Sequence, residues 1–184
     1  MRAFIGLGGN LGEPAAAFSA AAAELRGMGQ VVRASSLYDS AARDAISQPR
    51  FLNAALELET DMEPAALLLA LKRLELALGR DPQGRRWGPR VIDLDILSFD
   101  GRCVTDPEID LIVPHPRIQE RRFALEPLAE LDPQLRPWRN CSDLRMDVTI
   151  ADLLATVANQ DCQRIAGPEW ADPRGAGEPR HSNG

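Results

Sequence analysis

The sequence contains a single lysine, Lys72, and every other basic side chain is an arginine. No lysine lies near the glycine-rich stretches, which excludes a phosphate-binding loop of the Gly-Lys-Ser/Thr type. No apolar run reaches about 18 residues, so we expect no membrane-spanning helix and no membrane partner. The formal net charge is -6, which argues against a protein that coats nucleic acid.

Cysteine is also scarce. Cys103, Cys141 and Cys162 are odd in number, widely spaced and without any C-x-x-C pairing with histidines. This pattern predicts three free thiols, as found in a reducing compartment. The first residues, 1–6, include no long apolar segment of the kind found in signal peptides. We therefore expect a cytoplasmic protein.

A chain of 184 residues is long enough to bury a substantial core and suits one domain. We expect that domain to span residues 1–165. The last residues, 171–184, are rich in proline, glycine and charge, which predicts a disordered tail. We expect a monomer.

Hydrophobic periodicity predicts strands at residues 2–8, 30–38, 51–60 and 91–97, and helices at 13–27 and 64–79. The order strand, helix, strand, strand, helix, strand is typical of a ferredoxin-like α+β sandwich. We expect C-terminal additions to this unit. They are a hairpin partner at 102–104, a short strand at 111–113 and short helices at 123–131 and 149–158.

The stretch Arg-Trp-Gly-Pro-Arg-Val-Ile-Asp-Leu-Asp-Ile-Leu at 86–97 concentrates charge. Read as a strand, it places Asp93 and Asp95 on one face, roughly 6.5 to 7 Å apart. An isolated Asp-x-Asp is more often a solvated strand face than a site. Two acids on one face repel unless a cation neutralises them. Four arginines crowd beside this pair and favour a metal and phosphate site. They are Arg80, Arg85, Arg86 and Arg90.

A second polar cluster follows the short strand at 111–113. Two prolines flank His115 and restrict the chain on both sides of it. Arg117, Arg121 and Arg122 come shortly after. Both a structural histidine and a phosphate-facing histidine fit this pattern.

Five segments together resemble the 6-hydroxymethyl-7,8-dihydropterin pyrophosphokinases of folate biosynthesis. They are FIGLGGNLG at 4–12, QPRFLNAALELET at 48–60, LELALGR at 74–80, RRWGPRVIDLDIL at 85–97 and VPHPRIQERRFALEPLAEL at 113–131. The resemblance implies transfer of pyrophosphate from ATP to the hydroxymethyl group of the dihydropterin, with release of AMP. It also implies two Mg²⁺ ions, held by Asp93 and Asp95.

The same resemblance assigns roles to residues at matching positions. A catalytic role is implied for Asp95, Arg80, Arg90, His115 and Arg121. ATP binding is implied for Lys72, Glu75, Arg80, Arg86, Trp87, Arg90, Ile96, Ile112, His115 and Arg121. Pterin binding is implied for Ser40, Phe51, Asn53, Trp87, Phe123 and Asp93. Either Asp95 or a metal-bound water is expected to take the proton of the pterin alcohol.

Two departures from the family pattern leave other functions open. The loop at 40–44 reads Ser-Ala-Ala-Arg-Asp where the family usually has Thr-Pro followed by Gly, and a family arginine is missing near Asp81. Arg85 is a candidate substitute for it. One alternative is a catalytically weakened homologue that binds pterin or nucleotide and has a regulatory role. Another is a different metal-dependent Asp-x-Asp transferase.

Overall fold

The computed structural model describes residues 1–42, 48–84, 88–141 and 147–172. Within these ranges, a six-stranded antiparallel sheet has the order β5-β1-β4-β3-β8, and β2 also pairs with β4. Its strands are β1 (Arg2–Gly9), β2 (Gln30–Ala34), β3 (Leu37–Ser40), β4 (Phe51–Glu59), β5 (Asp93–Phe99) and β8 (Gln163–Ala166). The central order and antiparallel pairing are those of the expected ferredoxin-like α+β fold.

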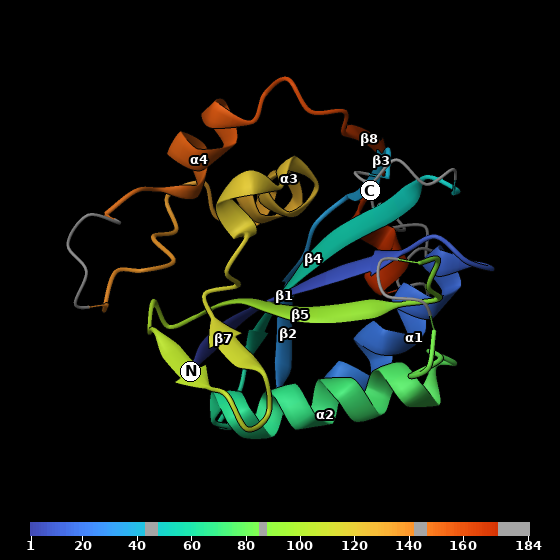
Figure 1. Ribbon diagram of the computed structural model, residues 1–184, viewed down its shortest axis with the longest axis horizontal. Coiled ribbons are helices and arrows are strands. Elements are labelled where there is room, and N and C mark those ends of the chain that lie inside the picture. Colours follow the sequence, from blue (N-terminus) through green and yellow to red (C-terminus); the bar gives the residue numbers. More distant parts are fainter. Residues whose placement is uncertain (43–47, 85–87, 142–146, 173–184) are drawn as a thin grey trace, which may run out of the picture.

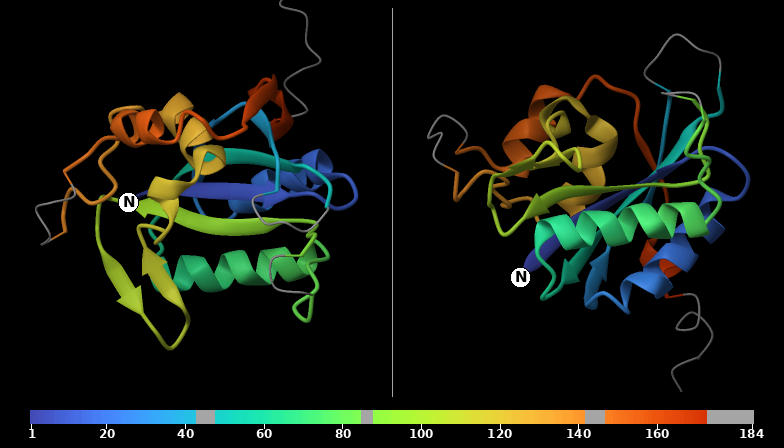
Figure 2. Two further views of the ribbon diagram at one scale, coloured as in Figure 1. Left: turned by 45° about the horizontal axis from the view of Figure 1, so that its top comes forward. Right: turned by 60° about the horizontal axis from the view of Figure 1, so that its bottom comes forward.

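Helices cover both faces of the sheet (Figures 1 and 2). On one face lie α1 (Pro14–Leu25) and α2 (Pro64–Ala77), and on the other lie α3 (Arg122–Leu131) and α4 (Ile150–Thr156). Alternation along the strands divides the core accordingly. Ile5 of β1 and Leu56 of β4 join the cluster with α1 and α2, whereas Phe4 and Ala55 join the cluster with α3 and α4.

The helix predicted at 64–79 forms as α2. Pro64 occupies the first turn, where its missing N–H has no intrahelical partner to lose. Leu67, Leu71 and Leu74 recur at helical spacing and are buried. Gly79 follows with a positive φ of 93°, which a glycine adopts without strain. This helix runs beside β5 and brings its polar residues next to that strand.

The single strand predicted at 30–38 is wrong, because the chain forms two strands, β2 and β3. The break falls at Ser35 and Ser36, which are fully buried. The Ser35 hydroxyl accepts a hydrogen bond from the amide of Ala55 at 2.9 Å. Ser36 donates through both its amide and its hydroxyl to Glu130 of α3, each at 2.8 Å. Serine side chains thus replace part of the strand ladder, which a periodicity argument does not detect.

The hairpin predicted between the strand at 91–97 and residues 102–104 is also wrong. Asp100 and Gly101 do form a turn, with φ of 49° and 66°. After this turn the chain leaves the sheet, and β6 (Val104–Asp106) pairs with β7 (Leu111–Val113) in a separate two-stranded sheet. A short helix, Ile118–Glu120, then leads into α3.

The prediction of three free thiols is wrong for two of them. Cys103 and Cys141 form a disulfide with a Cα–Cα distance of 5.3 Å, while Cys162 is free. The turn after β5 meets the segment that precedes Cys141. There Asn140 donates through its main-chain amide to the Gly101 carbonyl at 2.8 Å. The two cysteines are 38 positions apart, so only the tertiary meeting of these segments reveals the pair.

The described C-terminal segment packs against the sheet. Strand β8 pairs with β3, and a short helix follows at Pro168–Ala171. The Trp170 ring packs edge-on to Phe18 at 5.9 Å, and its indole N–H donates to the Ser35 carbonyl at 2.8 Å. The predicted helix near 149–158 forms as α4, with a capping box between Thr149 and Asp152. The predicted tail at 171–184 lies largely outside the described residues.

None of the helices in the described part of the chain is long and apolar enough to cross a membrane.

Candidate active site

One cavity, of about 540 Å³, lies over the open ends of β1, β4 and β5 and beneath the segment that leads into α3. Its lining combines charged side chains with two aromatic rings. Eleven residues that the sequence singled out line it together: Ser40, Phe51, Asn53, Lys72, Arg80, Arg90, Asp93, Asp95, His115, Arg121 and Phe123. Residues from five separate segments of the chain therefore converge on one space.

The two aspartates enter the cavity from β5. Strand alternation directs Asp93 and Asp95 to one face, as the sequence predicted, while Leu94 between them is fully buried on the other. On the neighbouring strand the residues opposite them are Gly8 and Gly6. Since these glycines carry no side chains, the floor of the cavity beside the carboxylates stays open.

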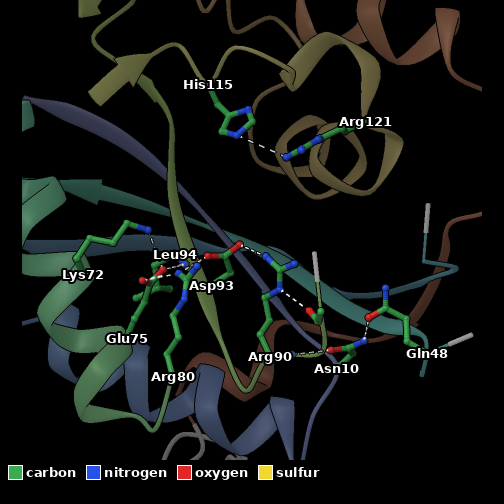
Figure 3. Close-up of polar contacts among 11 residues, drawn as sticks. Asn10, Gln48, Lys72, Glu75, Arg80, Arg90, Asp93, Leu94, His115 and Arg121 are labelled. Atoms are coloured by element: carbon green, nitrogen blue, oxygen red, sulfur yellow. Dashed lines mark hydrogen bonds and ion pairs between the residues drawn. The ribbon is translucent and has the colours of Figure 1, made fainter. Parts of the chain in front are cut away.

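Asp93 is held by two arginines (Figure 3). Arg80 donates to its Oδ1, and Arg90 donates to its Oδ2 at 2.7 Å. Burial raises the pKa of Asp93, but the positive charges of Arg80 and Arg90 outweigh it, so its pKa lies below the ordinary value. Asp93 is therefore an ionised carboxylate in a cluster of guanidinium groups.

Glu75 extends this network into α2. It is 1% exposed, and its carboxylate pairs with Arg80 and with Lys72, the latter at 3.1 Å. The same carboxylate accepts the main-chain amide of Leu94 at 2.6 Å. Burial raises the pKa of Glu75, against the effects of Lys72 and the Leu94 amide. Glu75 does not line the cavity, so it acts on the cavity through its neighbours.

Asp95 differs from Asp93. No residue in the described ranges donates a hydrogen bond to its carboxylate. Burial, together with the negative charge of Asp93, raises the pKa of Asp95. A carboxylate that faces a cavity and accepts no hydrogen bond is the kind of group that a bound cation stabilises most.

His115 also lines the cavity and interacts electrostatically with Asp95. The segment before it contains a cis peptide between Val113 and Pro114, and its own amide donates to the Leu97 carbonyl at 3.2 Å. Burial lowers the pKa of His115, although Asp95 opposes the shift. Arg121 lies 3.5 Å from its Nε2. The histidine is thus positioned by main chain and adjoins the guanidinium of Arg121.

A further part of the cavity lining is polar and aromatic. The Asn53 amide donates to Ser40 Oγ at 2.9 Å and to the Phe51 carbonyl at 3.2 Å. The guanidinium of Arg90 lies 5.7 Å from the Phe51 ring centroid, and that of Arg121 lies 5.6 Å from the Phe123 centroid. This part offers ring faces and an amide, a combination suited to a planar heterocycle.

The structure does not bring every implied residue to the cavity. Ile96 is 4% exposed within the core beside α1 and α2, so its side chain points away. Ile112 lies on β7 and is 44% exposed, outside the cavity lining. Arg85, Arg86 and Trp87 lie outside the described residues.

The cavity also includes residues that the sequence did not single out as site residues. Gln48 lines it from a loop and Glu120 from the short helix Ile118–Glu120, and neither segment is long enough in regular structure for periodicity to be informative. Arg117 lines it as well, and its place next to the histidine segment was the only signal for it. Asn10, which holds two loops at the edge of the cavity, gave no signal beyond its glycine-rich surroundings.

Metal-ligand candidates are limited in the described part of the chain. It contains no group of three or more His, Cys, Asp or Glu side chains that could hold a metal ion. Among the described lining residues, Asp93, Asp95 and Glu120 carry carboxylate oxygens, and the two aspartates share one strand face. Mg²⁺ is commonly bound by one or two carboxylates, with water and substrate phosphates completing the shell. The donor set therefore fits Mg²⁺ when a phosphate ligand is present.

The chain was compared with known families and proteins. The family model for 7,8-dihydro-6-hydroxymethylpterin-pyrophosphokinase (HPPK) matches residues 4–133. A 2-amino-4-hydroxy-6-hydroxymethyldihydropteridine pyrophosphokinase of Methylorubrum extorquens is 42% identical over 136 residues, 73% of this chain and 84% of that protein. The protein of that name from Bacillus subtilis is 35% identical over 182 residues, 98% of this chain and 96% of its own length.

Solved structures show the same fold. Wild-type HPPK-DHPS of Plasmodium falciparum matches with a TM-score of 0.63 and 16% identity, over 86% of this chain. The matched part is 41% of that longer chain, so the chain described here spans less than half of it. At this identity the likeness concerns the fold alone.

Proposed function

Because the chain belongs to the 7,8-dihydro-6-hydroxymethylpterin-pyrophosphokinase family, we propose that it transfers pyrophosphate from ATP to 6-hydroxymethyl-7,8-dihydropterin, releasing AMP. One observation carries the proposal. A single cavity is lined both by a carboxylate and arginine cluster and by an amide with two aromatic rings. The first suits a triphosphate and the second suits a flat heterocycle. The product is the pterin pyrophosphate of folate biosynthesis.

The triphosphate is assigned to the basic side chains of the lining. Arg80, Arg90 and Arg121 line the cavity with His115 and Lys72. Phosphoryl transfer depends mainly on positioning and on neutralising charge in the transition state. A guanidinium group can donate to two phosphate oxygens at once and stays protonated. It is therefore suited both to positioning the phosphates and to neutralising their charge. Glu75 holds Lys72 and Arg80 in place for this contact.

Asp93 and Asp95 are the residues that we propose to hold two Mg²⁺ ions. The open carboxylate of Asp95 and the hard oxygen donors of both residues support this assignment. When bound, Mg²⁺ neutralises charge on the phosphates of ATP. Arg80 and Arg90 already pair with Asp93 and are placed to move onto phosphate oxygens as ATP enters.

The dihydropterin is assigned to the aromatic rings and the amide of the lining. Phe51 and Phe123 supply ring faces, and Asn53 reads hydrogen-bonding groups on the edge of the heterocycle. Ser40 accepts the Asn53 amide and so fixes its orientation. We assign Trp87 to stacking and Arg86 to the nucleotide from the family pattern. The side chains of Ile96 and Ile112 do not line the cavity, so any contact of these residues with ATP is made by their main chain or outside the cavity.

The reaction forms one bond and breaks one. The pterin hydroxymethyl oxygen bonds to the β-phosphorus of ATP, and the bond from that phosphorus to the α,β-bridging oxygen breaks, so AMP leaves. The alcohol proton departs as the new bond forms, either to Asp95 or to water. We assign His115 and Arg121 to stabilising charge on the transferred group, and their shared place in the cavity lining supports this role.

Product analysis tests the proposal. The purified protein is incubated with ATP, the dihydropterin and Mg²⁺, and AMP and the pterin pyrophosphate are measured by chromatography. We expect equal amounts of both products, and none when EDTA is added in excess. Pterin binding without AMP would instead identify a weakened, regulatory homologue. AMP that forms equally well without the pterin would identify another Asp-x-Asp transferase.

Neither alternative gains support from the relatives above, which are named as pyrophosphokinases. A monomeric state, a cytoplasmic location and the domain limits at 1–165 and 171–184 stay predictions. Light scattering after gel filtration tests the first of these.

A further inference from the structure

Asn10 connects two loops at the border of the cavity (Figure 3). Its side-chain Nδ2 donates to Gln48 Oε1 at 3.2 Å and to the Pro49 carbonyl at 3.0 Å. Its Oδ1 accepts the main-chain amide of Arg90 at 2.9 Å. One side chain therefore donates hydrogen bonds to the loop before β4 and accepts one from the segment before β5.

The main chain beside Asn10 holds the Arg90 segment a second time. The amides of Asn10 and Leu11 both donate to the Arg90 carbonyl, at 2.9 and 3.1 Å. Gly9 allows this approach, because a Cβ there would lie 2.4 Å from the Val91 carbonyl oxygen. Asn10 is only 7% exposed, so bulk water cannot easily replace its side-chain hydrogen bonds.

Each of the two loops carries a residue of the cavity. Pro49 lies two residues before Phe51, and Arg90 donates to Asp93 at 2.7 Å. The two loops meet again inside the cavity, where the Arg90 guanidinium lies 5.7 Å from the Phe51 ring centroid. Asn10 itself does not line the cavity. Any effect that it has on substrates must therefore pass through these neighbours.

We propose that Asn10 is a positioning residue that couples the Phe51 side of the pterin pocket to the segment presenting Arg90 to the phosphates. The names of the two ligands rest on the proposed function. When one substrate binds, it restrains one of the two loops. Because Asn10 is hydrogen-bonded to both loops, the other loop is then restrained as well. The residues that bind the pterin and those that bind the phosphates therefore become competent together.

Two substitutions separate the two contacts of Asn10. Asn10→Asp keeps an oxygen acceptor for the Arg90 amide but loses both donated hydrogen bonds, whereas Asn10→Ala loses all three. We expect Asn10→Asp to raise KM for the dihydropterin about ten-fold and to change KM for ATP less than about two-fold. Asn10→Ala should lower kcat/KM for both substrates, by roughly 100-fold.

Asn140→Asp is the matched control. Asn140 also donates through Nδ2 to a main-chain carbonyl, that of Asp100 at 2.7 Å, but it lies outside the cavity lining. We expect this variant to keep wild-type KM values. If Asn10 had a purely structural role, its substitution would lower the melting temperature and leave KM for both substrates unchanged. That result, or a wild-type KM for the pterin in Asn10→Asp, overturns the proposal.

Hydrogen exchange tests the coupling without any assay of turnover. Gln48→Ala removes one acceptor of Asn10, and we expect the Arg90 amide to exchange about three-fold faster or more. Unchanged exchange at Arg90 in that variant overturns the coupling. If the wild-type protein releases no AMP from ATP and pterin, the proposed function fails, while the exchange result still decides the role of Asn10.

Discussion

The carboxylate of Glu75 accepts the main-chain amide of Leu94 at 2.6 Å, between the two aspartates of the cavity. Glu75 and Leu94 are 1% and 0% exposed, so this hydrogen bond lies in the interior. It ties α2 to β5 at the residue that separates Asp93 from Asp95. This hydrogen bond thus fixes β5 relative to α2, and with it the position of both carboxylates in the cavity.

Glu75→Ala should destabilise the protein by about 2 to 4 kcal/mol, because it leaves the Leu94 amide and part of the Arg80 charge without a partner. Glu75→Gln keeps an acceptor for the amide and should cost less. Urea unfolding measures both. Glu63→Ala is the control, since Glu63 pairs with Arg102 at the surface and its side chain is 64% exposed. Its expected cost is below about 1 kcal/mol, and equal costs at the two sites would contradict the buried role of Glu75.

Asp95→Ala should lower kcat by more than about 100-fold, the scale expected when a metal ligand is lost. The fold should persist, because no described residue donates a hydrogen bond to this carboxylate. Steady-state AMP release and circular dichroism measure the two effects. The exposed Asp147, whose side chain is 70% accessible, gives a control as Asp147→Ala. A near-normal rate in Asp95→Ala refutes the assignment.

Reduction of the Cys103–Cys141 disulfide should lower the free energy of unfolding. The bridge closes a segment with a sequence separation of 38. Loop-closure entropy for that length gives an upper value of about 4 kcal/mol. Guanidinium unfolding of the double variant Cys103→Ser, Cys141→Ser measures the loss. Cys162→Ser should leave stability within about 1 kcal/mol of wild type, and the same loss in both proteins would argue against the bridge.

Cys162 should react slowly with iodoacetamide at neutral pH. Burial, with a contribution from Glu126, raises the pKa of its thiol to about 11, above the ordinary value of 9.0. Because the folded pKa is raised, the neutral thiol favours the folded state below pH 9, and this contribution fades as pH rises toward 11. The alkylation rate of the native protein should therefore keep rising up to about pH 11. A rate that levels off near pH 8 to 9 would show an unshifted thiol.

Much of the cavity could be predicted from the sequence because its residues sit on regular elements. Asp93 and Asp95 share a strand face by alternation, and Asn53 and Phe51 share another. The family motifs then related these strands to one another. Gln48 and Glu120 could not be predicted in this way, because a loop and a three-residue helix have no periodicity from which to infer the direction of a side chain.

The sequence by itself determined helices α1 and α2, strands β1, β4 and β5, the face of the sheet that carries the acids and the family to which the chain belongs. Local propensity and periodicity act over a few residues, so they can be read without coordinates. Only the tertiary structure decided the Cys103–Cys141 bridge, the pairing of β6 with β7 and the bridging role of Asn10. Each depends on which distant segments meet, and that outcome is set by packing of the whole chain.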